Sequence, residues 1–415
     1  MALTGSLRRT GVALLAATAL VALPVVGTEG WTGTSGVVAA DHGSSRAWHG
    51  GWAASPQPPN ARFAPKWSEQ GFADHTVRQV VRVSTGGTTA RIELSNRYGK
   101  TPLRITGATV ARTDEGASVK PGSVRRLSFG KGRSVTIPAG GTAHSDGVPF
   151  RVGALESVTV TLYLAEATGP ATFHSFASAT SYRADGDHRY DRGGAAFKET
   201  SDSWYYLSGV ELSGGPAGRR DAVGSGLDAD NRYPDELAER FAAAGKPRSV
   251  LNHGIGGNQV TQDTVWAGEK GITRFKLDAL SEPNVGTVVV LEGINDFGSS
   301  SWGDGSPEVS VEQLIEGHRS LIRQAHAKGV KVIGATLTPV KGSFYYTPVN
   351  EAKREAFNHW IRTSGEYDAV VDFDRALADP ADPDRILPAY DSGDHLHPGD
   401  EGYRAMAEAL DLNAF

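Results

Sequence analysis

A short segment near the end of the chain brings acids and histidines close together. The segment is DSGDHLHP, residues 391–398, in which Asp394 stands three positions before His397. A carboxylate can hold one imidazole nitrogen while the other nitrogen takes a proton, and Pro398 stiffens such a loop. These residues predict an oriented general base, which needs a nucleophile to act on.

Two other polar loops are expected beside this base. SVLNHGIGGN and TVVVLEGIND each read as an apolar strand that runs into a Gly-rich loop, at 254–258 and 293–296. Almost wholly apolar strands are typical of a parallel sheet covered on both faces, where ligands bind outside the carboxyl ends of the strands. At that rim, the backbone N–H of Gly257 and the side-chain amide of Asn295 could hold a developing oxyanion.

The first half of the chain has the apolar period of β-strands. In ARIELSN, Ala90, Ile92 and Leu94 fall on one side of the chain, and SVTVTLYL repeats the alternation. Turns rich in Gly, Pro, Asn and Asp separate these runs. The pattern predicts an antiparallel β-sandwich of jelly-roll type over residues 51–214.

The second half, residues 220–415, alternates helical periods with apolar strands and is predicted to be α/β. Ser310 and Gln313 form an expected capping box at the start of one helix. Pro234 opens another helix, and Asp400 is the expected N-cap of the last.

The N-terminus has the layout of a secretory signal peptide. Arg8 and Arg9 precede an apolar run, which predicts a signal peptide over 1–27, followed by a flexible leader over 28–50. The alternative, an uncleaved membrane anchor, is disfavoured because the run is shorter than the ~20 residues of a spanning helix. We therefore expect a secreted protein without a membrane partner after cleavage.

Composition narrows the function classes further. The 415 residues carry a formal net charge of -5 and include no cysteine. The charges are mixed, without a basic run that would indicate nucleic acid as a partner. A chain without cysteine has no disulfide, no Cys metal site and no Cys nucleophile.

The three loops, taken in order, resemble a known family. GIGGN, GIND and DHLHP are similar to blocks two, three and five of the SGNH/GDSL hydrolases, and WAASPQPP resembles the N-terminal domain of secreted two-domain members. The resemblance implies a flavodoxin-like α/β/α domain that hydrolyses a small acyl ester or an acetylated carbohydrate without a cofactor. It also implies that Gly257 and Asn295 are oxyanion donors, that His397 is the base, and that Asp394 orients it.

The nucleophile of that family is not found where it is expected. The first block should be a strand ending in Gly-Asp-Ser, but the region reads RRDAVGSGLDADNRYP. Ser225 stands nine residues before Pro234 and matches a second, noncatalytic serine of similar two-domain members. It could serve as nucleophile only if the chain shifted to place it at the strand end. Without it, the same fold would be a carbohydrate-binding or acyl-binding protein with affinity but no turnover.

Two further site readings stay open at the level of sequence. His395 and His397, with Asp391 or Asp394, could bind zinc or calcium. A glycosidase would place paired carboxylates at strand ends. The acids at or near strand ends are Glu292, Asp296, Asp372 and Asp374.

The aromatic residues of the first half allow a sugar-stacking face, although core packing is the favoured reading. They are Trp48, Trp52, Trp67 and the SWYY segment 203–206.

Overall fold

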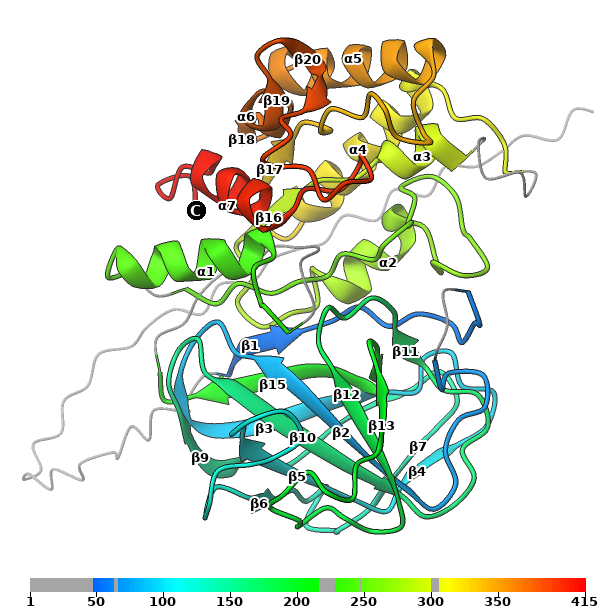
Figure 1. Cartoon of the computed structure of the whole chain (residues 1–415), viewed down its shortest axis with the longest axis vertical. Coiled ribbons are helices and arrows are strands. Elements are labelled where there is room, and N and C mark those ends of the chain that lie inside the picture. The colour runs from blue at the N-terminus through cyan, green and yellow to red at the C-terminus, as the bar shows by residue number, and fades with distance from the viewer. Residues whose placement is uncertain (1–47, 63–65, 216–227, 247, 300–305) are drawn as a thin grey trace, which may run out of the picture. The chain divides into compact units, whose positions relative to one another are not determined.

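The computed structural model describes residues 48–62, 66–215, 228–246, 248–299 and 306–415 (Figure 1). Residues 46–415 form one compact unit. The predicted signal peptide and Ser225 lie outside the described residues. Within the described ranges, no helix combines the length and apolar character needed to cross a bilayer.

The N-terminal half is built from two antiparallel sheets. The first has the order β1 (His49–Ala53), β15 (Leu207–Ser213), β3 (Gly87–Ser95) and β8 (Thr142–His144), and β9 (Val148–Val152) also pairs with β3. The second has the order β13 (Glu199–Ser201), β12 (Ser181–Asp185), β2 (His75–Arg82), β10 (Ser157–Leu164), β5 (Gly107–Arg112) and β6 (Arg125–Arg126). The N-terminal half also contains two separate two-stranded pairs. They are β4 (Leu103–Ile105) with β7 (Val135–Ile137), and β11 (Phe173–His174) with β14 (Trp204–Tyr205).

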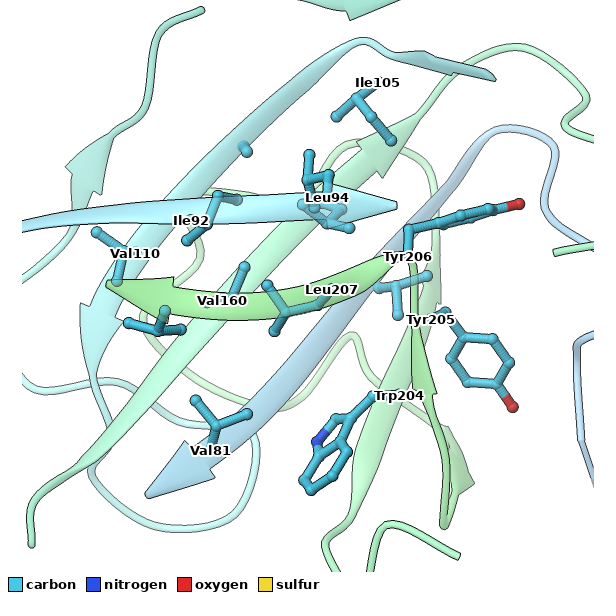
Figure 2. Close-up of a cluster of buried hydrophobic side chains, with 14 of the residues drawn as sticks. Val81, Ile92, Leu94, Ile105, Val110, Val160, Trp204, Tyr205, Tyr206 and Leu207 are labelled. Atoms are coloured by element: carbon cyan, nitrogen blue, oxygen red, sulfur yellow. The ribbon is translucent and has the colours of Figure 1, made fainter. Parts of the chain in front are cut away.

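Both sheets contribute to one apolar core, as the period-two pattern predicted. Ile92 and Leu94 of β3 and Val160 of β10 are fully buried in it. Figure 2 shows their side chains together with Val81 of β2 and Leu207 of β15. The prediction of a β-rich first half is confirmed.

Three tryptophans of this half belong to the same core, whereas Trp48 is half-buried, with the Arg91 guanidinium 4.4 Å from its ring centroid. Trp52, Trp67 and Trp204 are each at most 6% exposed, and Trp67 stacks on Tyr205 at 5.3 Å. The alternative in which these rings form a sugar-stacking surface is therefore wrong for these three tryptophans and Tyr205, because Trp52 packs on Trp204 and Trp67 on Tyr205.

The C-terminal half is a three-layered α/β structure. Parallel strands β16 (Thr287–Val290), β17 (Lys331–Ala335) and β18 (Ala369–Val371) form its sheet. Val288 and Val290 pack into a core cluster with residues of α2 (Gly271–Asp278), α4 (Val311–His326) and α5 (Pro348–Thr363). Val289 and Ile333 pack into another cluster with residues of α1 (Tyr233–Ala243) and α7 (Asp400–Ala409). Because successive residues of a strand point to opposite faces, these two clusters show that helices cover both faces of the sheet. The predicted α/β class is confirmed.

Shorter elements lie at the ends of these strands. They are α3 (Ile294–Gly298), α6 (Phe373–Leu377), β19 (Ala378–Asp379) and β20 (Asp382–Ile386).

One predicted strand is absent from the described sheet. Residues 249–251, expected as the strand before GIGGN, have no strand assignment. The Val250 N–H donates instead to Ser84 Oγ at 2.9 Å, and the Ser249 hydroxyl donates to the Gly50 carbonyl. The sequence prediction was wrong here because the polar groups of this segment find partners in the β-rich half.

The predicted helix ends are confirmed in part. The capping box of Ser310 and Gln313 is present in full, and Pro234 lies in the first turn of α1. The N-cap of α7 is Gly399, whereas Asp400 is the first helical residue. The assignment of Asp400 as N-cap was therefore wrong by one position.

Candidate active site

One pocket contains the four predicted site residues that the structure describes. Gly257, Asn295, Asp394 and His397 all line it, and its volume is about 740 Å3. Gly257 and the Asp394–His397 pair lie in loops, whereas Asn295 lies in the first turn of α3, so the loop expected at 293–296 is mostly a short helix. The fold thus brings together residues that are far apart in the sequence. Ser225, the candidate nucleophile, lies outside the described residues.

The Asp394 carboxylate fixes the His397 ring. Its Oδ2 lies 2.6 Å from His397 Nδ1, while its Oδ1 accepts from the backbone N–H groups of Leu396 and His397 at 2.9 and 2.8 Å. Partial burial opposes ionisation, but the hydrogen bonds from His397 and the loop outweigh it and lower the pKa of Asp394 to about 2. A carboxylate that stays ionised holds Nδ1 protonated and leaves Nε2 as the proton acceptor.

The same loop holds a second Asp–His pair. His395 Nδ1 lies 2.5 Å from Asp391 Oδ2, and Asp391 Oδ1 accepts from the N–H groups of Gly393 and His395. This ring lies against Gly342, where an added Cβ would approach it to 3.2 Å. His395 is not among the residues that line the pocket.

The metal reading of this loop is not favoured by these contacts. Among the described residues, these four side chains do not form a group with the spacing of metal ligands. Among the described residues, the group with the spacing of metal ligands is a different one, made of Glu351, Glu355 and Asp384.

The amide of Asn295 is held in a defined orientation. Its Nδ2 donates to the Asn258 carbonyl at 3.0 Å, and its Oδ1 accepts from the Tyr345 hydroxyl at 2.9 Å. An amide nitrogen carries two N–H groups, so one remains for an oxyanion. Gly257 has φ +77°, and a Cβ there would lie 1.8 Å from the Trp266 ring, so only glycine fits this position.

Asp296 connects the two loops that carry these donors. Its carboxylate accepts from the N–H groups of Val260 and Thr261 at 2.9 and 3.0 Å, and from the Thr261 hydroxyl at 2.7 Å. Burial raises the pKa of Asp296 to about 6, although these hydrogen bonds favour its charged form. The residue therefore braces the segment after Gly257 against the helix that begins beside Asn295.

The other acids considered for a glycosidase are also engaged in structural contacts. Asp372 pairs with Arg362 and Asp374 with Arg354. Burial raises the pKa of Glu292 to about 7, partly offset by Arg274. A pair of carboxylates facing one pocket is not found among these four described acids.

Arg274 is a buried centre of polar contacts that sequence reasoning missed. Its guanidinium donates to Asn258 Oδ1 at 2.7 Å, to the His253 carbonyl at 2.6 Å and to Glu292 Oε1 at 3.2 Å. Ser55 of the β-rich half lies 3.4 Å from the same group. In the sequence this arginine is one position of an amphipathic helix, and nothing marks it as different from a surface residue.

The β-rich half also contributes to the pocket, which the sequence did not reveal. His174, Ser175, Phe176 and Ser178, at and after the end of β11, line the cavity together with the loops of the α/β half. The candidate site is therefore made by both halves of the compact unit.

Comparison with known proteins gives a match to one family. A model of the "GDSL-like Lipase/Acylhydrolase family" matches residues 217–405. Among curated proteins, no relative matches the chain.

Several solved structures are similar to part of this chain. A putative lipolytic protein of the G-D-S-L family from Desulfitobacterium hafniense DCB-2 is 21% identical, with a TM-score of 0.36, and covers 46% of this chain and 96% of its own. An acetyl xylan esterase, 18% identical, has the same coverage and TM-score. The inhibitor-bound aryl esterase of M. smegmatis, 14% identical, also has that coverage and TM-score.

Proposed function

We propose that this protein is a hydrolase of carboxylic esters, because a model of the GDSL-like lipase/acylhydrolase family matches residues 217–405. The observation that carries the proposal is the His397–Asp394 pair, 2.6 Å apart, in a pocket that Gly257 and Asn295 also line. A base and a set of oxyanion donors around one cavity are the requirements of acyl transfer.

In the proposed reaction, a nucleophilic hydroxyl gives its proton to His397 Nε2 and attacks the ester carbonyl. The negative charge that develops on the carbonyl oxygen is stabilised by the free N–H of Asn295 and the backbone N–H of Gly257. The protonated His397 then donates its proton to the leaving alcohol, and water repeats the sequence to release the acid. Asp394 stabilises the imidazolium throughout.

Ser225 is the candidate for the hydroxyl, and a small acyl ester or an acetylated carbohydrate is the proposed substrate class. A second candidate function is ligand binding without turnover. It is favoured by one observation: the segment RRDAVGSGLDADNRYP lacks the Gly-Asp-Ser that carries the nucleophile in similar proteins.

Hydrolysis of p-nitrophenyl acetate by the full chain and by Ser225→Ala tests the two candidates. Turnover that Ser225→Ala abolishes supports the ester hydrolase with Ser225 as nucleophile. Turnover that this change leaves intact supports the hydrolase and excludes Ser225. A chain that binds acetylated sugar without hydrolysing any ester supports the binding protein.

We also propose that residues 1–27 direct export, on the basis of Arg8 and Arg9 before the apolar run. N-terminal sequencing of protein recovered from the culture medium should give a start after this segment. Intact Met1, retained with the cells, would contradict export.

A further inference from the structure

The wall that the β-rich half adds to the pocket is a strained loop. Phe176 and Ser178, which follow β11, have φ of +55° and +50°. These values lie in the left-handed region that non-glycine residues adopt at an energetic cost, and such strain is often found at functional sites. The loop thus holds its side chains in a backbone conformation that the surrounding structure must impose.

Phe176 presents an aromatic ring at this wall. Its side chain is 43% exposed, although most large apolar residues of this half are buried. The ring lies beside the oxyanion loop, since a Cβ added to Gly256 would be 3.5 Å from Phe176 Cδ2. Lys66 Nζ lies over one face of this ring, 4.7 Å from its centroid. A ring that lines a cavity can present its remaining exposed carbons to a ligand.

His174 adds a polar atom of fixed character to the same wall. Its Nδ1 lies 2.8 Å from the Ser55 carbonyl, and because a carbonyl only accepts, Nδ1 must carry the proton. Nε2 is then an unprotonated acceptor. The ring stacks on Trp204 with centroids 5.6 Å apart and is 9% exposed, so it cannot turn freely.

The protonation state agrees with this assignment. Burial lowers the pKa of His174 to about 4, and nearby arginines act in the same direction against the hydrogen bond to Ser55. The ring is therefore neutral near pH 7. No described residue forms a hydrogen bond with its Nε2, although the ring lines the cavity. An acceptor on the wall of a cavity, without a hydrogen-bond partner among the described residues, is suited to a hydroxyl or N–H of a ligand.

We propose that His174 Nε2 accepts a hydrogen bond from a hydroxyl group of the alcohol part of the ester, while the Phe176 ring packs against the C–H face of the same part. An aromatic face beside a fixed acceptor fits the ring of a sugar or similar polyol. The β-rich half is then the element that selects O-acylated sugars. This inference rests on the proposed ester hydrolysis and adds to it the residues that choose the alcohol.

The test compares two substrates in the full chain and in His174→Phe, which removes the acceptor but keeps a ring against Trp204. The substrates are a monoacetylated methyl xyloside and p-nitrophenyl acetate, whose alcohol part has no further hydroxyl. We expect kcat/KM for the xyloside ester to fall about tenfold, the worth of one neutral hydrogen bond. For p-nitrophenyl acetate we expect a change of less than about twofold.

A deoxy xyloside ester completes the comparison. Removal of the substrate hydroxyl should cost the unchanged protein about tenfold and cost His174→Phe almost nothing, because a double-mutant cycle isolates the contact. Phe176→Ala should also weaken the xyloside reaction selectively. Tyr190→Ala, which removes an aromatic side chain 49% exposed and outside the pocket, is the matched control and should change neither rate.

Equal losses on all substrates would assign His174 to packing alone and overturn the inference, as would no loss at all. If p-nitrophenyl acetate is hydrolysed but the sugar hydroxyl has no effect, the proposed function stands and this inference fails. If no ester is hydrolysed, calorimetric titration with the methyl xyloside decides: affinity weakened about tenfold by His174→Phe supports the contact. The absence of binding overturns it.

Discussion

The two Asp–His pairs of one loop differ in position rather than in chemistry. Both join a carboxylate to Nδ1, at 2.6 Å for His397 and 2.5 Å for His395, and both carboxylates also accept backbone N–H groups. Only His397 lines the pocket with the oxyanion donors, whereas His395 lies against Gly342. An imidazole oriented by a carboxylate is therefore a candidate base only where its ring also lines a pocket that contains oxyanion donors.

Replacement of each histidine in turn should give the largest difference in kcat between the two pairs. His397→Ala removes the proton acceptor, and we expect kcat for p-nitrophenyl acetate to fall by about 10⁴. His395→Ala is the matched control and should stay within about threefold, because it changes no group of the pocket. Comparable losses of kcat in both variants would contradict the assignment of His397 as the base.

Replacement of the two aspartates should have the next largest effect. Asp394→Ala removes the group that holds the tautomer of His397, and kcat should fall by about 10² or more with little change in KM. Asp391→Ala should lower kcat far less. Circular dichroism of both variants checks that the loop change leaves the fold intact; a larger kinetic loss in Asp391→Ala would contradict the assignment.

Asp296→Ala tests the surroundings of His397 while both Asp–His pairs stay in place. The change leaves the N–H groups of Val260 and Thr261 without their acceptor, so we expect the free energy of unfolding to fall by about 3 kcal/mol. Activity should fall about tenfold as the oxyanion donors lose their spacing. Urea unfolding and kcat measure the two effects, and Asp114→Ala, at an exposed acid, serves as the control. An unchanged stability would show that Asp296 is no brace.

The smallest effect concerns acid stability. The folded pKa of Asp394, about 2, lies below its value of about 3.9 in an unfolded chain. Its contribution is therefore present above pH 4 and is lost as the pH falls towards 2. Between pH 4.5 and 2.5, the melting temperature of Asp394→Asn should fall less than that of the unchanged protein. The two decreases should differ by a few degrees at most, because the Asp394 side chain is half exposed. Parallel curves for the two proteins would contradict the low pKa.

Local signals in the sequence predicted much of the fold and part of the site. The alternation of Ala90, Ile92 and Leu94 gave the buried face of β3, since a strand has only two faces. The pair Asp394 and His397 could be predicted because its contact is local, within one turn of a loop. Gly257 could be singled out because GIGGN resembles a family block, and its φ of +77° explains why glycine stands there.

The residues that the sequence did not reveal act through distant partners. Arg274 contacts groups from three parts of the chain, and His174 faces the pocket from the β-rich half. Neither position differs locally from an ordinary helix or strand residue. Residues 249–251 show the same limit, because an apolar run fits a strand whether or not a neighbour is there to pair with it.

Alkylation by methyl 4-nitrobenzenesulfonate shows which histidine the pocket makes reactive, because this small ester can transfer its methyl group to an imidazole without needing a serine nucleophile. Peptide mass mapping of the treated full chain would show which histidine has reacted. We predict methylation of His397, at least about tenfold faster than of His395 and slowed by an acetylated sugar. Equal labelling of the two rings, or preference for His395, would contradict the claim that the pocket selects His397.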